Sequence, residues 1–474
     1  MRHWLDTLLL TLFAALAYAC LRQDAVHHLD MHGVVRSVVA PPGEGVRYGH
    51  FGYQWLVLAL HWLLGPDAPL YRPLQWCSVV AAALAVGAGH RACLAIGFDR
   101  MRAALVAVGA GGTLTATFFA TVAEIHAVFW LPVNVMFWAL AKFVRSPRVP
   151  GAVLVGALGA AAAAVHSSGH VLPGLMLLAM LAARLPGAAG WGRVAVWWSS
   201  MLGTHVAVSL LLLLIDHVCV GFASDAASQG FLAETLARWQ GFGALPGIAW
   251  REWLQAYAPF SLMALAALLH PSTRAPASAC LIAVLGYLAI DLVLLIGLVE
   301  HGAYALPLAL PLAALTALRF GRAGAAAAAA VAIGIAVPHV LRQDPARVPR
   351  PEFARALGAW RVEHPGSTFV LGGYAEIDSM LVYGAPIWHH TILEPEFVVW
   401  LEPQRSAAFV RERLVARIRK AAANGGALVF STEATALFTA LPRNLEILSD
   451  PRGEFVVETV AAGAFGGIAL HPPR

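Results

Sequence analysis

The sequence predicts a polytopic all-α membrane protein, with about 11 transmembrane helices and a small C-terminal α/β soluble domain. Of its 474 residues, 59% are hydrophobic and only 12% are charged, whereas ordinary soluble domains are about a quarter charged. The charge is also uneven. Residues 342–474 carry 28 Lys, Arg, Asp and Glu side chains, and the preceding 341 residues carry 31. We therefore expect a membrane domain over residues 1–341 and a soluble domain over residues 342–474.

The membrane domain contains eleven candidate spans. A span needs about 20 mainly apolar residues, and shorter ones are tolerated inside a bundle. We expect the first span to be retained as a helix, because no small-residue cleavage site precedes the polar stretch that follows it. The candidates lie near residues 4–21, 75–96, 103–119, 127–143, 150–165, 170–184, 194–215, 256–270, 277–298, 303–318 and 323–341.

Basic residues lie in every second short loop, which predicts the orientation of the chain. If the N-terminus is cytoplasmic, all five cytoplasmic loops are basic; one of them holds Lys142, Arg145 and Arg148. The C-terminal domain is then periplasmic, and the chain lies in a bacterial inner membrane. The opposite loops collect histidines and carboxylates. Because ionisable groups at membrane depth usually line a cavity or reactive site, we expect a reaction chamber at the outer leaflet.

The first outer loop, residues 22–74, is long, and such loops tend to be functional. Asp30 in this loop can act as a general base or hold a metal, although a solvated carboxylate is the alternative. His50 is framed by glycines that let the backbone approach a ligand closely. Arg36 and Arg47 can bind phosphate oxygens or, equally, lipid headgroups.

Two further outer turns carry candidate site residues. Glu124 lies in an otherwise uncharged stretch from 103 to 141 and is followed by His126. His166 and His170 are four residues apart and would share one face of a helix. The Ser-Ser-Gly between them suggests a break, however, so a metal-binding pair is only weakly indicated. Ordinary interfacial histidines are the alternative.

Two other segments suggest helices that lie on the outer leaflet. The apolar and aromatic stretch 51–65 is too short for a clear span and would roof a cavity. The stretch 231–239 is amphipathic and would gate a lipid carrier. Near it, Arg251 is a further candidate for binding phosphate. The alternative, which we weigh at least equally, is that the Trp and Arg side chains here only anchor the chain at the membrane interface.

In the C-terminal domain, strands are expected at 368–371, 387–393 and 427–430, with helices near 375–383 and 404–424. This alternation indicates a partly parallel sheet, with recognition of the acceptor as its expected task. The net charge of +5 is dispersed in short loops and forms no basic face, which excludes nucleic acid as a partner.

The order of these motifs resembles the GT-C fold of membrane glycosyltransferases, and most closely the bacterial protein O-mannosyltransferase-like group. Asp30 follows the first span, and His50-Phe51-Gly52-Tyr53 resembles a His-Pro-Pro-Gly-Tyr element. Thr121–Ala127 resembles a Thr-Val-Ala-Glu-Val-Tyr-Ala element, with His126 in place of Tyr. His166 and Tyr304 also fall in similar places. No second carboxylate directly follows Asp30, which places a metal requirement in doubt.

The resemblance implies an inverting transfer of a sugar from a polyprenyl-phosphate carrier to a hydroxyl acceptor on protein, lipid or glycan. Asp30 would be the catalytic base, and Arg36 or Arg47 would steady the departing phosphate. Glu124 and His126 would orient hydroxyl groups. The same likeness places the side chains of His50, Tyr53, His166 and His170 at the substrate.

No cofactor is assigned, and a divalent metal remains possible. The absence of a GxxxxGK loop agrees with a lipid-linked donor. The alternative is a non-catalytic transporter of lipid-linked sugar, or a scaffold of envelope glycan assembly. Asp291, which lies well inside a predicted span, supports a transporter, whereas the lack of an internal repeat opposes it.

Overall fold

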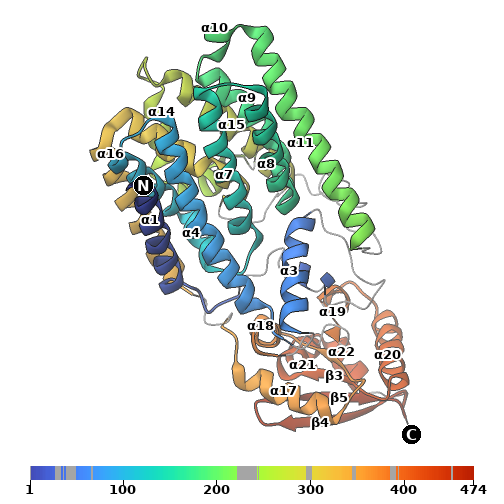
Figure 1. Ribbon diagram of the computed structural model, residues 1–474. Helices are drawn as coiled ribbons and strands as arrows, with labels where there is room; N and C mark the ends of the chain where they lie inside the picture. Colours follow the sequence, from blue (N-terminus) through green and yellow to red (C-terminus); the bar gives the residue numbers. More distant parts are fainter. Residues whose placement is uncertain are drawn as a thin grey trace.

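The computed structural model has a helical body and a smaller α/β domain (Figure 1). In Figure 1 the helical body occupies the upper part of the view, and the α/β domain lies below it. The structure describes residues 2–26, 34–35, 37–38, 50–65, 68–220, 243, 245–294, 302–343, 348–384, 391–392, 394–449 and 452–473.

Within these residues, five helical segments are long and apolar enough to cross a membrane, or six if one bent pair forms a single span. The bent pair is α5 and α6, which meet at 65°. By this measure the chain is a multi-span membrane protein with fewer spans than the eleven expected. The five segments are α1 (Arg2–Cys20), α4 (Tyr71–Ile96), α7 (Ile125–Arg145), α11 (Trp191–Cys219) and Ala303–Leu341, which comprises η4 (Ala303–Leu308) and α16 (Ala309–Leu341).

The difference in number has two causes. Several predicted spans fold as apolar helices of fewer than 18 residues. The last two predicted spans are counted as one segment, Ala303–Leu341, although two helices meet within it at Gly321, where φ is 68° and the backbone is not helical. The break predicted between residues 318 and 323 is therefore present. The other helices of the body are α3 (Phe51–Leu64), α5 (Arg100–Gly111), α6 (Leu114–Thr121), α8 (Val149–Val165), η1 (Ser167–Val171), α9 (Leu172–Ala182), α10 (Leu185–Ala189), α13 (Leu245–Ile248), η3 (Ala249–Gln255), α14 (Phe260–Ala267) and α15 (Arg274–Leu294).

Small residues allow the helices of the body to pack closely. A Cβ atom on Gly156 of α8 would lie 2.3 Å from the carbonyl oxygen of Met201 in α11. The two backbones therefore touch at this glycine, as is common between membrane helices. The bend between α5 and α6 occurs at Thr113, whose side chain accepts a hydrogen bond from the amide of Ala116 and caps α6.

The C-terminal domain is built on a five-stranded mixed sheet in the order β2-β1-β3-β5-β4. The first three strands in this order are parallel. β5 pairs antiparallel with β3, and β4 pairs antiparallel with β5. The strands are β1 (Thr368–Val370), β2 (Thr391–Ile392), β3 (Leu428–Ser431), β4 (Val456–Ala462) and β5 (Phe465–His471). The helices are α17 (Pro351–Glu363), α18 (Tyr374–Tyr383), α19 (Glu394–Leu401), α20 (Ala407–Ala423), α21 (Thr432–Thr439) and α22 (Pro442–Leu448). The expected parallel part of the sheet is present, and the β4–β5 hairpin was not foreseen.

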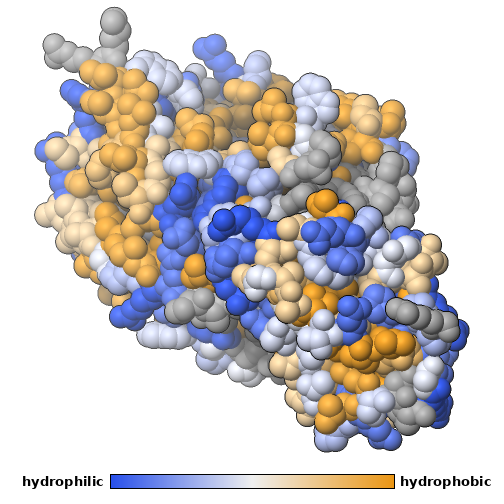
Figure 2. Space-filling model, turned by 90° about the horizontal axis from the view of Figure 1, so that it is seen from below, coloured by the Kyte–Doolittle hydropathy of each residue, from blue (hydrophilic) through white to orange (hydrophobic). Residues whose placement is uncertain are grey.

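The two parts of the chain meet through a shared hydrophobic cluster. Val382 of α18 is buried with Tyr71 and Leu74 at the start of α4 and with Val57 of α3. Figure 2 views the molecule from the side of the C-terminal domain. Hydrophobic side chains cover much of the flank of the helical body, and hydrophilic ones gather near the C-terminal domain. The start of α4 therefore marks the end of the helical body that faces this domain.

One buried carboxyl group should make the C-terminal domain sensitive to pH. Glu376 is 2% exposed and accepts hydrogen bonds from the amide of Gly372 and the hydroxyl of Ser431. Burial raises its pKa above the ordinary value of 4.5. The folded state therefore binds this proton more tightly than the unfolded state. The stability that the proton contributes is present below pH 4.5 and is lost as the pH rises through the folded pKa.

We expect Glu376→Gln to make the sheet more stable relative to the wild type as the pH rises from 4.5 to 7. The glutamine keeps an acceptor oxygen for Gly372 and carries no charge. Hydrogen exchange of β1 and β3 peptides in the full chain, compared between variant and wild type at each pH, measures this difference. A constant difference across the pH range would contradict the prediction.

Candidate functional site

Four rings from four separate segments meet at the end of the helical body nearer the C-terminal domain. We call His50, His126, His166 and Tyr304 the ring cluster. His166 is central: its ring centroid lies 4.4 Å from that of His50, 4.7 Å from that of His126 and 5.3 Å from that of Tyr304. Two phenylalanine rings, Phe119 and Phe129, also contact the cluster.

The break after α8 determines the position of His166. His166 ends α8 and begins η1, and its Nδ1 accepts a hydrogen bond of 3.2 Å from the amide of Ser168. The hydroxyl of Ser168 also lies 2.7 Å from Nδ1. Since Nδ1 is an acceptor, the neutral ring carries its proton on Nε2. Within the described part of the chain, Nε2 of His166 is buried and has no hydrogen-bond partner. Nε2–H is therefore a buried donor whose partner is not among the described residues.

A glycine allows His50 to stack on His166. A Cβ atom on Gly52 would lie 2.9 Å from both the carbonyl carbon and the carbonyl oxygen of Ala164, so α3 touches the last turn of α8. The two imidazole planes differ by 14°, and the amide of Ser167 donates a hydrogen bond of 3.4 Å to Nδ1 of His50. Gly52 was expected to let the backbone approach a ligand. Instead, it lets one helix approach another.

We expect Gly52→Ala to destabilise the protein by about 1–3 kcal/mol, because the added methyl group meets backbone atoms that cannot rotate away. Thermal unfolding of the purified protein measures this loss. Gly174→Ala is the matched control, since a Cβ atom at Gly174 in α9 has nothing within 4 Å. An equal loss of stability in both variants would contradict the prediction.

Glu124 begins the helix that carries His126. It is fully buried, and one carboxylate oxygen accepts a hydrogen bond of 2.9 Å from the amide of Ile125. This is the N-terminal end of α7, where the helix dipole favours a negative charge. The hydroxyl of Ser78 contacts both the amide and the carbonyl oxygen of Glu124, at 3.3 and 3.1 Å. Glu124 is therefore held at a defined position at the start of the helix that carries His126.

The turn before Glu124 is tied to the end of α1. The side-chain amide of Gln75 donates to the carbonyl oxygens of Gln23 and Thr121, at 2.7 and 2.8 Å. Gln23 in turn donates through its side chain to the hydroxyl of Thr121, at 3.0 Å. These buried bonds position the chain that leads into the first long loop next to the Glu124 turn.

A second buried carboxylate positions Tyr304. Glu252 of η3 accepts a hydrogen bond of 2.5 Å from the amide of Gly302, and the hydroxyl of Tyr257 donates to the carbonyl oxygen of the same glycine. Gly302 has φ +74°, a conformation that favours glycine. Its neighbour in η3, Arg251, is exposed. Sequence reasoning selected Arg251 and missed Glu252, although a carboxylate between two tryptophans was a usable signal.

The other predicted site residues fall into three groups. Asp30, Arg36 and Arg47 lie outside the described residues, as do the predicted amphipathic helix 231–239 and the side chain of Asp291. Tyr53 is buried in the hydrophobic cluster that contains Val382. His170 does not join His166. Its Nδ1 lies 3.3 Å from Nε2 of His205, which sequence reasoning missed because it is a lone histidine inside an apolar span.

Among the described residues, no group of three or more His, Cys, Asp and Glu side chains could hold a metal ion. In the ring cluster, the rings of His50 and His166 are stacked face to face, and the ring of His126 is tilted by 46° to that of His166. The arrangement therefore offers hydrogen-bond donors, a carboxylate and flat apolar surfaces to a ligand.

No protein-family model matches the sequence, and no curated protein matches it. Solved structures do match. The structure of ArnT from Cupriavidus metallidurans bound to undecaprenyl phosphate aligns with a TM-score of 0.57 at 13% identity, covering 99% of this chain and 98% of that one. ArnT in the apo state aligns at 0.46, with 15% identity and coverage of 98% and 99%. The Archaeoglobus fulgidus oligosaccharyltransferase tethered with an acceptor peptide aligns at 0.49, with 12% identity and coverage of 98% and 74%.

At such low identities, the likeness to ArnT bound to undecaprenyl phosphate shows the fold alone. It extends over nearly the whole of both chains and therefore includes the helical body and the C-terminal domain. The chain has an ArnT-like GT-C fold.

Proposed function

We propose that this chain is an inverting glycosyltransferase that moves a sugar from a polyprenyl-phosphate carrier to a hydroxyl acceptor at the outer leaflet. The observation that carries the proposal is the ring cluster at one end of a multi-span helical body, with the buried Glu124 capping the helix that carries His126. The fold supports it, because the similar ArnT structure was determined with undecaprenyl phosphate bound.

The reaction requires a base, a donor group for the phosphate and contacts that orient the sugar. A base removes the proton of the acceptor hydroxyl, the oxygen attacks the anomeric carbon, and the bond from that carbon to the phosphate oxygen breaks. We assign the base to Asp30, and the stabilisation of the departing phosphate to Arg36 or Arg47.

The described residues supply the remaining contacts. The buried carboxylate of Glu124 can accept a hydrogen bond from a substrate hydroxyl, and Nε2–H of His166 can donate one. A buried charge–hydroxyl contact is stronger than one in water, because the surrounding dielectric constant is lower. Glu124 and His166 would therefore orient the two substrates while Asp30 takes the proton.

Mass spectrometry of surface glycans and glycoproteins tests the proposal, in cells that carry the wild type, a deletion or Asp30→Asn at matched expression. We expect one sugar mass to disappear both in the deletion and in Asp30→Asn. The molecule that loses this mass identifies the acceptor. If the deletion changes the envelope and Asp30→Asn does not, Asp30 is not the base, and a scaffold or transporter becomes the better explanation.

A further inference from the structure

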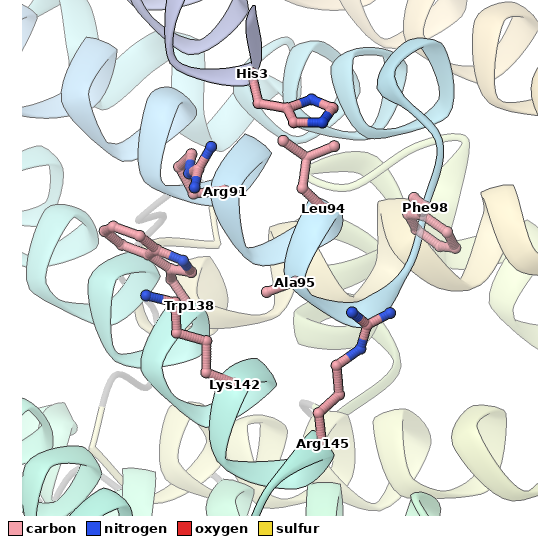
Figure 3. Close-up of a pocket in the computed structure, with 8 residues that line it drawn as sticks. All are labelled: His3, Arg91, Leu94, Ala95, Phe98, Trp138, Lys142 and Arg145. Carbon is pink, nitrogen blue, oxygen red and sulfur yellow. The ribbon is translucent and has the colours of Figure 1, made fainter. Parts of the chain in front are cut away.

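A basic pocket lies at the end of the helical body opposite the ring cluster. Its cavity volume is about 490 Å³, and it is lined by His3 of α1, by Arg91, Leu94, Ala95 and Phe98 at the end of α4, and by Trp138, Lys142 and Arg145 at the end of α7 (Figure 3). α4 has 26 residues and is therefore about 39 Å long. Since its first residues pack against the C-terminal domain, the pocket lies on the opposite face of the membrane domain.

The pocket is basic and has no acidic lining residue. Within the described chain, Arg91, Lys142 and Arg145 form no salt bridge. Arg91 lies 4.1 Å from the ring centroid of Trp4 and 5.5 Å from that of Trp138, and Nζ of Lys142 lies 4.3 Å from that of Trp138. Nε of Arg91 is buried without a hydrogen-bond partner among the described residues. Aromatic faces thus hold these two cations in place and leave their charge uncompensated.

Asp6 and Asp99, which follow pocket residues in the sequence, pair with cations that do not line the pocket. Asp6 of α1 accepts a hydrogen bond of 2.5 Å from Arg100. Asp99, just after α4, lies 3.0 Å from Arg322. The pocket therefore presents three positive charges, and nothing in its lining neutralises them.

The surroundings of the pocket suit a lipid. Trp4 is 56% exposed, and Leu5, Leu8 and Leu12 of α1 are more than half exposed, so an apolar helix face continues from the pocket. Tryptophan side chains concentrate where the hydrocarbon of a membrane meets water. An acyl chain can lie along this face of α1 while its headgroup occupies the basic pocket.

We propose that this pocket binds the phosphate group of an anionic lipid, on the membrane face opposite the C-terminal domain. The two arginines and the lysine contact phosphate oxygens, and Trp4 and Trp138 mark the depth of the headgroup. This site is separate from the ring cluster and does not depend on the proposed transfer reaction.

Native mass spectrometry of the purified full chain tests the proposal with phosphatidylglycerol, phosphatidylethanolamine and inorganic phosphate as probes. The pocket variant is Lys142→Gln with Arg145→Gln; both side chains are exposed, so the fold is retained. The control is Arg148→Gln with Arg193→Gln, which removes two exposed positive charges that do not line the pocket. Size exclusion and thermal unfolding verify that both variants are folded.

We expect the pocket variant to bind phosphatidylglycerol at least tenfold more weakly than the wild type, and the control variant to bind it unchanged. Phosphatidylethanolamine should bind weakly to all three proteins. An equal loss in both variants would show diffuse attraction to a basic surface and overturn the proposal. Displacement of phosphatidylglycerol by millimolar inorganic phosphate would show a site for a free anion and overturn the assignment to a lipid.

Discussion

Replacing Glu124 with glutamine is expected to reduce sugar transfer at least about a hundredfold while leaving the helical body folded. The glutamine keeps an oxygen that can accept the hydrogen bond from the amide of Ile125, so the N-cap of α7 survives. What is lost is the negative charge of a fully buried side chain at the start of the helix that carries His126. Transfer per folded molecule, measured with purified protein and a polyprenyl-phosphate sugar, quantifies the effect.

Glu124→Ala separates the two roles of the carboxylate. It should lose transfer to the same extent and also lose about 0.5–2 kcal/mol of stability, because the N-cap is removed. Asp99→Asn is the matched control. Asp99 caps α5 by accepting a hydrogen bond from the amide of Arg102, and α5 begins at the opposite end of the body. If Glu124→Gln transfers sugar as fast as the wild type, Glu124 is a helix cap and has no part in the reaction.

The sequence predicted the class of fold because that class depends on composition and order. Membrane helices follow from apolar length, and the parallel strands of the C-terminal domain follow from alternating apolar runs and glycines. The number of spans was predicted less well. Whether an apolar stretch stops at 17 residues, as α8 does, or bends within a predicted span, as α5 and α6 do, depends on packing that periodicity does not encode.

The candidate site, like the fold, was predicted only in part from the sequence. The uncharged stretch around Glu124 argued against a solvated face, and the side chain is fully buried. The Ser-Ser-Gly between His166 and His170 predicted a break, and the structure has one at η1. The contact of His170 with His205 could not be predicted, since it depends on how η1 folds back on α8. A Cβ atom on Gly169 would lie 2.6 Å from the backbone of Ala163, so this turn requires glycine. The helical spacing of the two histidines is broken at this turn, and His170 contacts α11 instead.

The second large effect is expected at His166, where different substitutions remove different atoms. In His166→Asn, an amide oxygen can replace Nδ1 as the acceptor for Ser168, but nothing replaces the Nε2–H donor. We expect transfer to fall by up to about a hundredfold, because a buried substrate hydroxyl left without its donor costs about 1–3 kcal/mol. His166→Gln has a longer side chain that can place an N–H near the position of Nε2, and it should retain more transfer than His166→Asn.

Higher transfer by His166→Gln than by His166→Asn identifies Nε2–H as a donor, because either substitution alone could also disturb the stack of His166 on His50. His90→Asn is the matched control: His90 is equally buried, and its Nδ1 contacts the hydroxyl of Thr7 on α1, far from the ring cluster. Transfer and thermal stability are measured for all three variants. If Gln and Asn at position 166 lose transfer equally, in proportion to their loss of stability, His166 supports the packing of the ring cluster and does not bind substrate through Nε2.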